Sequence, residues 1–150
     1  MNHACPTQPA VTLEVPPYPD NLVIVRLMVG LIAEALGFAE TETLQIELSV
    51  DEACANSIAA MQENRVEETV PGVRVEIAIE ERCLQIAIID RGRNFSEHFE
   101  RALPFHEGTD RTRKRGYGLQ IIKTLMDEVQ YIHEAGIGNK LVLTKYRSGV

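Results

Sequence analysis

Tryptophan is absent from the sequence, and all aromatic residues together make up only 5% of it. Because 45% of the residues are hydrophobic, the core must be built mainly from isoleucine, leucine and valine. A chain of 150 residues has the size of one ordinary domain. We therefore expect residues 1–150 to form a single domain, with residues 1–10 as a flexible tail.

Cysteine and positive charge are also scarce. The three cysteines, Cys5, Cys54 and Cys83, form no C-x-x-C pair, and their odd number predicts reduced thiols. The formal net charge is −7, so the broad basic surface of a nucleic-acid-binding protein is missing. We expect no direct contact with nucleic acid.

Long uninterrupted hydrophobic runs are missing as well. The most apolar run, residues 22–38, contains Arg26 and Glu34, which make it too charged and too short to span a bilayer. Residues 1–10 lack the apolar centre of a signal peptide. The sequence thus predicts a cytoplasmic protein without a membrane segment.

Hydrophobic periodicity predicts the order of helices and strands. Apolar residues recur at helical spacing or alternate as in strands. The predicted strands are 11–15, 73–79, 84–89, 129–134 and 140–146, and the predicted helices are 22–35, 41–62 and 119–128. Residues 93–115 show no period, which is typical of a functional or disordered loop. This order predicts an α+β fold, a mixed and mostly antiparallel sheet with helices on one face.

Two polar residues on one face of the predicted helix 41–62 are candidates for chemistry. Glu52 and Asn56 are four positions apart, so their side chains lie side by side. A carboxylate there can accept a proton or orient a hydroxyl, and an amide oxygen is a ligand type that Mg²⁺ accepts. So short a pattern also occurs on helices with two solvated polar residues, and its meaning depends on the rest of the chain.

A second candidate lies at the end of the predicted strand 84–89. Asp90 can accept a hydrogen bond from an exocyclic amine, and Gly92 would let a flat ring approach the backbone. An ordinary Asp-x-Gly turn has the same pattern.

A third candidate opens the last predicted helix, where Gly116 and Gly118 expose backbone N–H groups. A helix N-terminus favours an anion. Four basic residues precede the glycines: Arg111, Arg113, Lys114 and Arg115. The arrangement suits a polyphosphate, although a flexible hinge beside a solvated basic face has the same signature.

Taken together and in this order, the three patches resemble the N box and the two glycine boxes of the GHKL superfamily. The segments VDEACANSI, DRGRNF, GYGLQIIKTLMDEVQY and NKLVLTK are similar to serine/threonine kinases of the anti-sigma factor type. The resemblance covers residues 10–147 and implies a two-layer α/β sandwich of the GHKL (Bergerat) type.

The resemblance also implies a role for each matched position. Glu52 would be the catalytic general base toward a protein serine or threonine hydroxyl, and Asn56 would hold Mg²⁺ against the phosphates of ATP. Asp90 would read the adenine amine, with Gly92 beside the ring. The phosphates would be bound by Arg115, Gly116, Gly118 and Leu119.

The implied activity is phosphorylation of a small anti-anti-sigma protein of the STAS type, with a sigma factor as the alternative partner. A homodimer through the first helix and strand is also implied. Three positions depart from the family pattern: Ala60 replaces a common histidine, Asn94 replaces a glycine, and Asn139-Lys140 replaces a Gly-Thr pair. These departures concern kinase activity and the choice of partner more than ATP binding.

Two other functions therefore stay open. A non-catalytic module could bind ATP to set the conformation of the loop and transfer no phosphate. The catalytic half of a sensor histidine kinase is a poorer match, because only about ten residues precede the first strand and His3 lies in a Pro-flanked tail.

Overall fold

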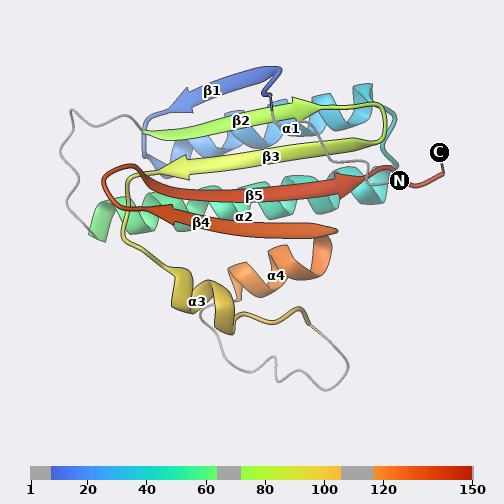
Figure 1. Cartoon of the computed structure of the whole chain (residues 1–150). Coiled ribbons are helices and arrows are strands. Elements are labelled where there is room, and N and C mark those ends of the chain that lie inside the picture. The colour runs from blue at the N-terminus through green and yellow to red at the C-terminus, as the bar shows by residue number, and fades with distance from the viewer. Residues whose placement is uncertain (1–7, 64–71, 106–116, 150) are drawn as a thin grey trace.

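The chain forms two layers, a five-stranded sheet and helices packed against one face of it (Figure 1). The structure is a computed structural model that describes residues 8–63, 72–105 and 117–149. In chain order the elements are β1 (Val11–Val15), the 3-10 turn η1 (Pro19–Asn21), α1 (Leu22–Ala35), α2 (Glu40–Glu63), β2 (Val73–Ile79), β3 (Cys83–Asp90), α3 (Ser96–Arg101), α4 (Gly118–Leu125), β4 (Glu128–Glu134) and β5 (Gly138–Tyr146).

The strand order in the sheet is β1-β2-β3-β5-β4, and each neighbouring pair among the described strands is antiparallel. The prediction of a mostly antiparallel sheet is thus confirmed, and no parallel pair occurs between these strands. β3 is central, as its nearly continuous apolar sequence predicted. The ladder between β3 and β5 ends with Asp90 opposite Asn139.

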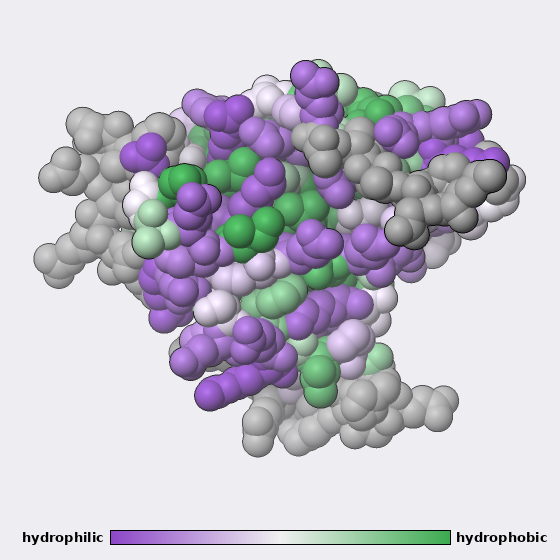
Figure 2. Space-filling view, in the orientation of Figure 1, coloured by the Kyte–Doolittle hydropathy of each residue, from purple (hydrophilic) through white to green (hydrophobic). Residues whose placement is uncertain are grey.

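The core lies between the sheet and the long helix α2. Ile46, Val50 and Ile58 of α2 pack with the inward side chains of the central strands. The opposite face of the sheet carries mainly hydrophilic side chains between smaller hydrophobic groups (Figure 2). One-sided burial of this kind is typical of antiparallel sheets. An enclosed site is therefore expected on the side of the sheet that the helices cover.

Two predictions about helices need correction. The last helix ends at Leu125 rather than near residue 128, because Met126 is extended and Asp127 accepts the backbone N–H of Tyr146. Residues 93–115 are not entirely irregular, because Ser96–Arg101 forms α3. A helix of six residues shows too little of the 3.6-residue period to be recognised in the sequence.

The cysteine prediction is right for one residue and wrong for another. Cys54 is free and buried, and burial raises the pKa of its thiol to about 12. Cys83 is disulfide-bonded, so it is not the reduced thiol that the sequence indicated. Spacing along the chain does not show which cysteines the fold brings together.

Within the described residues, no helix is long and apolar enough to cross a membrane.

Candidate functional site

The face of α2 that carries Glu52 and Asn56 lies against the first residue of α4. A Cβ atom built on Gly118 would lie 2.8 Å from Glu52 Oε2 and 3.3 Å from Asn56 Nδ2. A Cβ at this position would fit only if the carboxylate of Glu52 moved aside. The first backbone N–H groups of a helix have no partner within the helix, so α4 begins with donors beside a carboxylate and an amide.

Asp90, at the end of β3, is only 3% exposed. One of its oxygens, Oδ1, accepts hydrogen bonds from the backbone N–H of Gly92 at 2.7 Å and from Asn139 Nδ2 at 2.9 Å. No donor from the described residues reaches the other oxygen, Oδ2. Because Oδ1 is occupied by these two donors, Oδ2 is the oxygen that is suited to accept an N–H group from a ligand.

Gly92 brings the backbone after β3 against α2. A Cβ on Gly92 would lie 2.8 Å from the Cβ of Ala60 and 2.9 Å from Asp90 Oδ1. Ala60 stands one turn after Asn56, where many members of the resembled family carry a histidine. The small side chain and the glycine together allow a close approach of the two segments.

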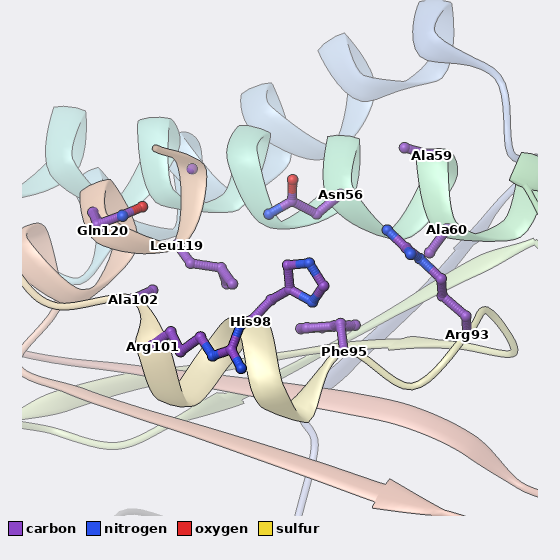
Figure 3. Close-up of a pocket in the computed structure, with 11 residues that line it drawn as sticks. Asn56, Ala59, Ala60, Arg93, Phe95, His98, Arg101, Ala102, Leu119 and Gln120 are labelled. Atoms are coloured by element: carbon purple, nitrogen blue, oxygen red, sulfur yellow. The ribbon is translucent and has the colours of Figure 1, made fainter. Parts of the chain in front are cut away.

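A cavity of about 380 Å³ lies between α2, α3 and the start of α4 (Figure 3). Cavities of roughly 300–1,000 Å³ are the usual size for small-molecule ligands. Figure 3 shows the imidazole of His98 pointing from α3 into the space below Asn56. The cavity is lined by Asn56, Ala59, Ala60, Arg93, Phe95, His98, Arg101, Ala102, Gly118, Leu119 and Gln120.

The helix α3 is held over the cavity by contacts with β4 and α4. The rings of Phe95 and Phe99 lie 4.2 and 5.6 Å from that of Tyr131 on β4, measured between centroids. Lys123 of α4 lies 3.9 Å from the centroid of the Phe99 ring and donates hydrogen bonds to the carbonyls of Phe99 and Ala102. Burial lowers the pKa of Lys123 and raises that of the Tyr131 phenol.

The structure therefore brings several of the predicted residues together. Asn56, Gly118 and Leu119 line the cavity, and Glu52 touches the position of Gly118 from the adjoining side. Glu52 also lines a second hollow of about 540 Å³ beside α1, with Arg26 and Asp51 among its neighbours.

The remaining predicted residues lie elsewhere or outside the described part. Asp90 and Gly92 are not in the cavity wall, and Gly92 meets the wall at Ala60. Arg115 and Gly116 lie outside the described residues, so their predicted contact with phosphate stays a prediction.

Sequence reasoning did not identify His98, Arg93 and Asn139 as residues near the site. Arg93 precedes the short helix α3 and His98 lies within it, and the position of this helix depends on tertiary contacts. Asn139 could have been found from the strand order, because it faces Asp90 across the ladder of β3 and β5.

Comparisons with known proteins show the family of the chain. The model of the family described as "Histidine kinase-like ATPase domain" matches residues 15–145. The serine-protein kinase RsbW of Bacillus mycoides is 26% identical over 91% of this chain and 84% of its own length. The protein of the same name from Bacillus subtilis is 28% identical over 93% of this chain and 86% of its own.

Two solved structures have a similar fold. The RsbU and RsbW domains of Rv1364c from Mycobacterium tuberculosis match 97% of this chain, which spans 34% of that longer chain, with a TM-score of 0.66 and 18% identity. The SiaB–SiaC complex from Pseudomonas aeruginosa contains a chain that matches 92% of this one over 90% of its own length, with a TM-score of 0.68 and 11% identity. The predicted GHKL-type fold is confirmed, and the chain belongs to the family of histidine kinase-like ATPase domains.

Proposed function

We propose that this chain is an ATP-dependent protein kinase that phosphorylates a serine or threonine of a small regulatory protein. The observation that carries the proposal is the cluster of Glu52, Asn56 and Gly118 at the N-terminus of α4. It places a carboxylate, an amide and free backbone donors next to one another, in a family of ATPase domains. Curated relatives along most of the chain are serine-protein kinases by name.

The hydrogen-bonding groups of the site suit adenine at one end and phosphates at the other. Asp90 Oδ2 offers an acceptor for the adenine amine, and the backbone of Gly92, which packs closely against Ala60, would lie beside the ring. The first turn of α4 offers backbone N–H groups to the phosphates, supported by the helix dipole. Leu119 covers the cavity between them.

Asn56 is the residue that would hold Mg²⁺, because its side chain lies beside the start of α4 and carries an amide oxygen, a ligand type that Mg²⁺ accepts. Mg²⁺ held there would neutralise charge on the phosphates. In the proposed reaction the hydroxyl of the partner protein attacks the γ-phosphorus of ATP as the bond to the ADP oxygen breaks. Glu52 accepts the proton of that hydroxyl.

The protein substrate would approach from the side of α1, where the second hollow leads to Glu52. Half of the residues that line this hollow are charged, among them Asp20, Arg26 and Asp51, and Arg26 pairs with Asp51 at 3.0 Å. We propose an anti-anti-sigma protein as the substrate. SiaB was solved as a complex with SiaC, which supports a protein partner for this fold.

The two helices α1 and α2 expose large apolar side chains, of which Val23 also lines that hollow: Val23, Ile24, Leu27 and Leu31 on α1, and Leu44 and Leu48 on α2. An apolar surface of this kind is typical of a protein interface. A sigma factor or a second copy of the chain could occupy it, and both are part of the proposal. The expected cytoplasmic location also stays a prediction.

The experiment is affinity capture with the purified chain from cell extract, in the presence of ATP, of ADP or of neither, followed by mapping of phosphorylated residues. The proposal expects a small protein that is recovered with nucleotide and gains phosphate on serine or threonine only with ATP. If a partner binds in an ATP-dependent manner and is never phosphorylated by the chain, the non-catalytic module is the correct function.

A further inference from the structure

Asn139 occupies an unusual position at the edge of the candidate site. It is 2% exposed, stands opposite Asp90 in the ladder of β3 and β5, and belongs to none of the residues that line the cavity. Gly138 makes this pairing possible, because a Cβ there would lie 2.1 Å from the carbonyl oxygen of Asp90. The strand β5 therefore starts directly beside the carboxylate.

The side chain of Asn139 uses all of its hydrogen-bonding groups. Its Nδ2 donates to Asp90 Oδ1 at 2.9 Å and to the backbone carbonyl of Arg93 at 2.8 Å. Its Oδ1 lies within hydrogen-bonding distance of the Tyr131 hydroxyl and, at 2.9 Å, of His133 Nδ1. A buried amide with both ends bonded has one orientation, since turning it over would set acceptors against acceptors.

These contacts decide which oxygen of Asp90 remains for a ligand. Oδ1 already receives two N–H groups, from Gly92 and from Asn139, whereas Oδ2 receives none from the described residues. A carboxylate held at one oxygen in this way cannot rotate without losing both bonds. Without Asn139, only the flexible Asp-x-Gly turn would orient it.

We propose that Asn139 is a positioning residue for base recognition, which fixes Asp90 so that Oδ2 accepts the exocyclic amine of the nucleobase. The inference rests on the proposed function and assigns the preference for an amino-purine to a pair of residues, Asp90 and Asn139. Asn139 acts through the carboxylate and does not touch the nucleotide.

The same amide connects base recognition to α3. The hydroxyl of Tyr131 accepts the backbone N–H of Phe95 at 3.0 Å and lies 3.1 Å from Asn94 Oδ1. Asn139 therefore joins the carboxylate at the end of β3 to the first residues of the segment that covers the cavity.

The test compares ATP with purine riboside triphosphate, which has the same ring and phosphates and lacks the amino group. Affinities are measured by calorimetry for the parent and for Asn139→Ala. One charge-assisted hydrogen bond gives the parent a preference for ATP of about 10- to 100-fold. In Asn139→Ala we expect the preference to fall to within roughly threefold, while the affinity for purine riboside triphosphate is unchanged.

A merely structural role predicts a different result, because damage to the fold weakens both nucleotides equally and keeps their ratio. Lys140→Ala is the matched control, since Lys140 is the next residue of β5 and pairs with Glu76 on the opposite face of the sheet. If Asn139→Ala does not fold, Asn139→Leu keeps the approximate volume, removes the donor and is expected to lose the preference as well. A folded variant of either kind that keeps the parent's preference overturns the inference.

A second measurement needs no nucleotide. The N–H of Gly92 is bonded to Asp90 Oδ1, so its hydrogen exchange, followed by NMR, reports the orientation of the carboxylate. We expect Asn139→Ala to lose protection at Gly92 while amides within β3 keep theirs; unchanged protection overturns the positioning role. A parent that binds neither nucleotide would refute the proposed function and the role in base recognition, and exchange at Gly92 would still show whether Asn139 holds Asp90.

Discussion

Gly118 and Glu52 meet at the junction of α4 and α2, where a Cβ on the glycine would lie 2.8 Å from Glu52 Oε2. This contact joins the carboxylate proposed as the base to the helix end proposed to bind phosphate. Any side chain at position 118 must displace Glu52 or move α4, so the two parts of the site cannot change independently.

Gly118→Ala should therefore weaken ATP binding while the fold stays intact. The methyl group must push the flexible end of Glu52 aside or shift the first turn of α4, at the lower end of the usual cost of overpacking, about 1 kcal/mol or roughly 5-fold in Kd. The measurement is calorimetric titration with ATP and Mg²⁺, with circular dichroism to check the fold.

A double variant shows whether Glu52 is the cause. Glu52→Ala removes the atom that the new methyl group meets first. In that background Gly118→Ala should cost much less affinity than it does in the parent. An equal loss in both backgrounds would mean that the contact between these residues does not control the site.

Lys123→Met should loosen α3 without unfolding the domain. The substitution keeps the length of the side chain and removes the ammonium that binds the carbonyls of Phe99 and Ala102. We expect faster hydrogen exchange in Ser96–Arg101 and unchanged exchange in the buried part of α2. Lys140→Met, on the outer face of the sheet, is the control, and equal effects of the two substitutions would contradict the anchoring role.

The buried thiol of Cys54 predicts a loss of stability at alkaline pH. Burial raises its pKa in the folded state from 9.0 to about 12, so the folded state keeps its proton over a range where the unfolded state releases it. The contribution is fully present below about pH 9 and is lost as the pH rises toward 12. The free energy of unfolding of Cys54→Ala should fall less steeply across this range than that of the parent; parallel curves would contradict the assignment.

The sequence predicted the helices and strands in which apolar residues recur with a regular spacing. The apolar positions of α2, which include Ile46, Val50 and Ile58, repeat at helical spacing, and those of β2 alternate. The pairing of Glu52 with Asn56 follows from the same helical spacing. Glycine at position 118 marked the start of α4 because of its place before an apolar helix.

The remaining features depend on contacts between distant segments. Helix α3 is stabilised by Tyr131 and Lys123, which follow it by more than twenty residues, and its own sequence shows no period. Asn139 reaches Asp90 only because β5 pairs with β3, and hydrophobic patterns do not determine this strand order. The sequence thus indicated the residues that meet at the junction of α2 and α4 better than those that hold them in place.

The central claim is that Glu52 acts as the base in transfer of phosphate to a protein hydroxyl. The direct measurement is the rate at which labelled γ-phosphate passes from ATP to the captured partner, for the parent and for Glu52→Gln, with ATP affinity measured alongside. The glutamine keeps the size of the side chain and cannot accept the proton, so we predict a rate about 10²–10⁴ lower with little change in ATP affinity. Transfer by Glu52→Gln at the parent's rate, or a parent that binds both ATP and its partner and transfers no phosphate, would contradict the claim.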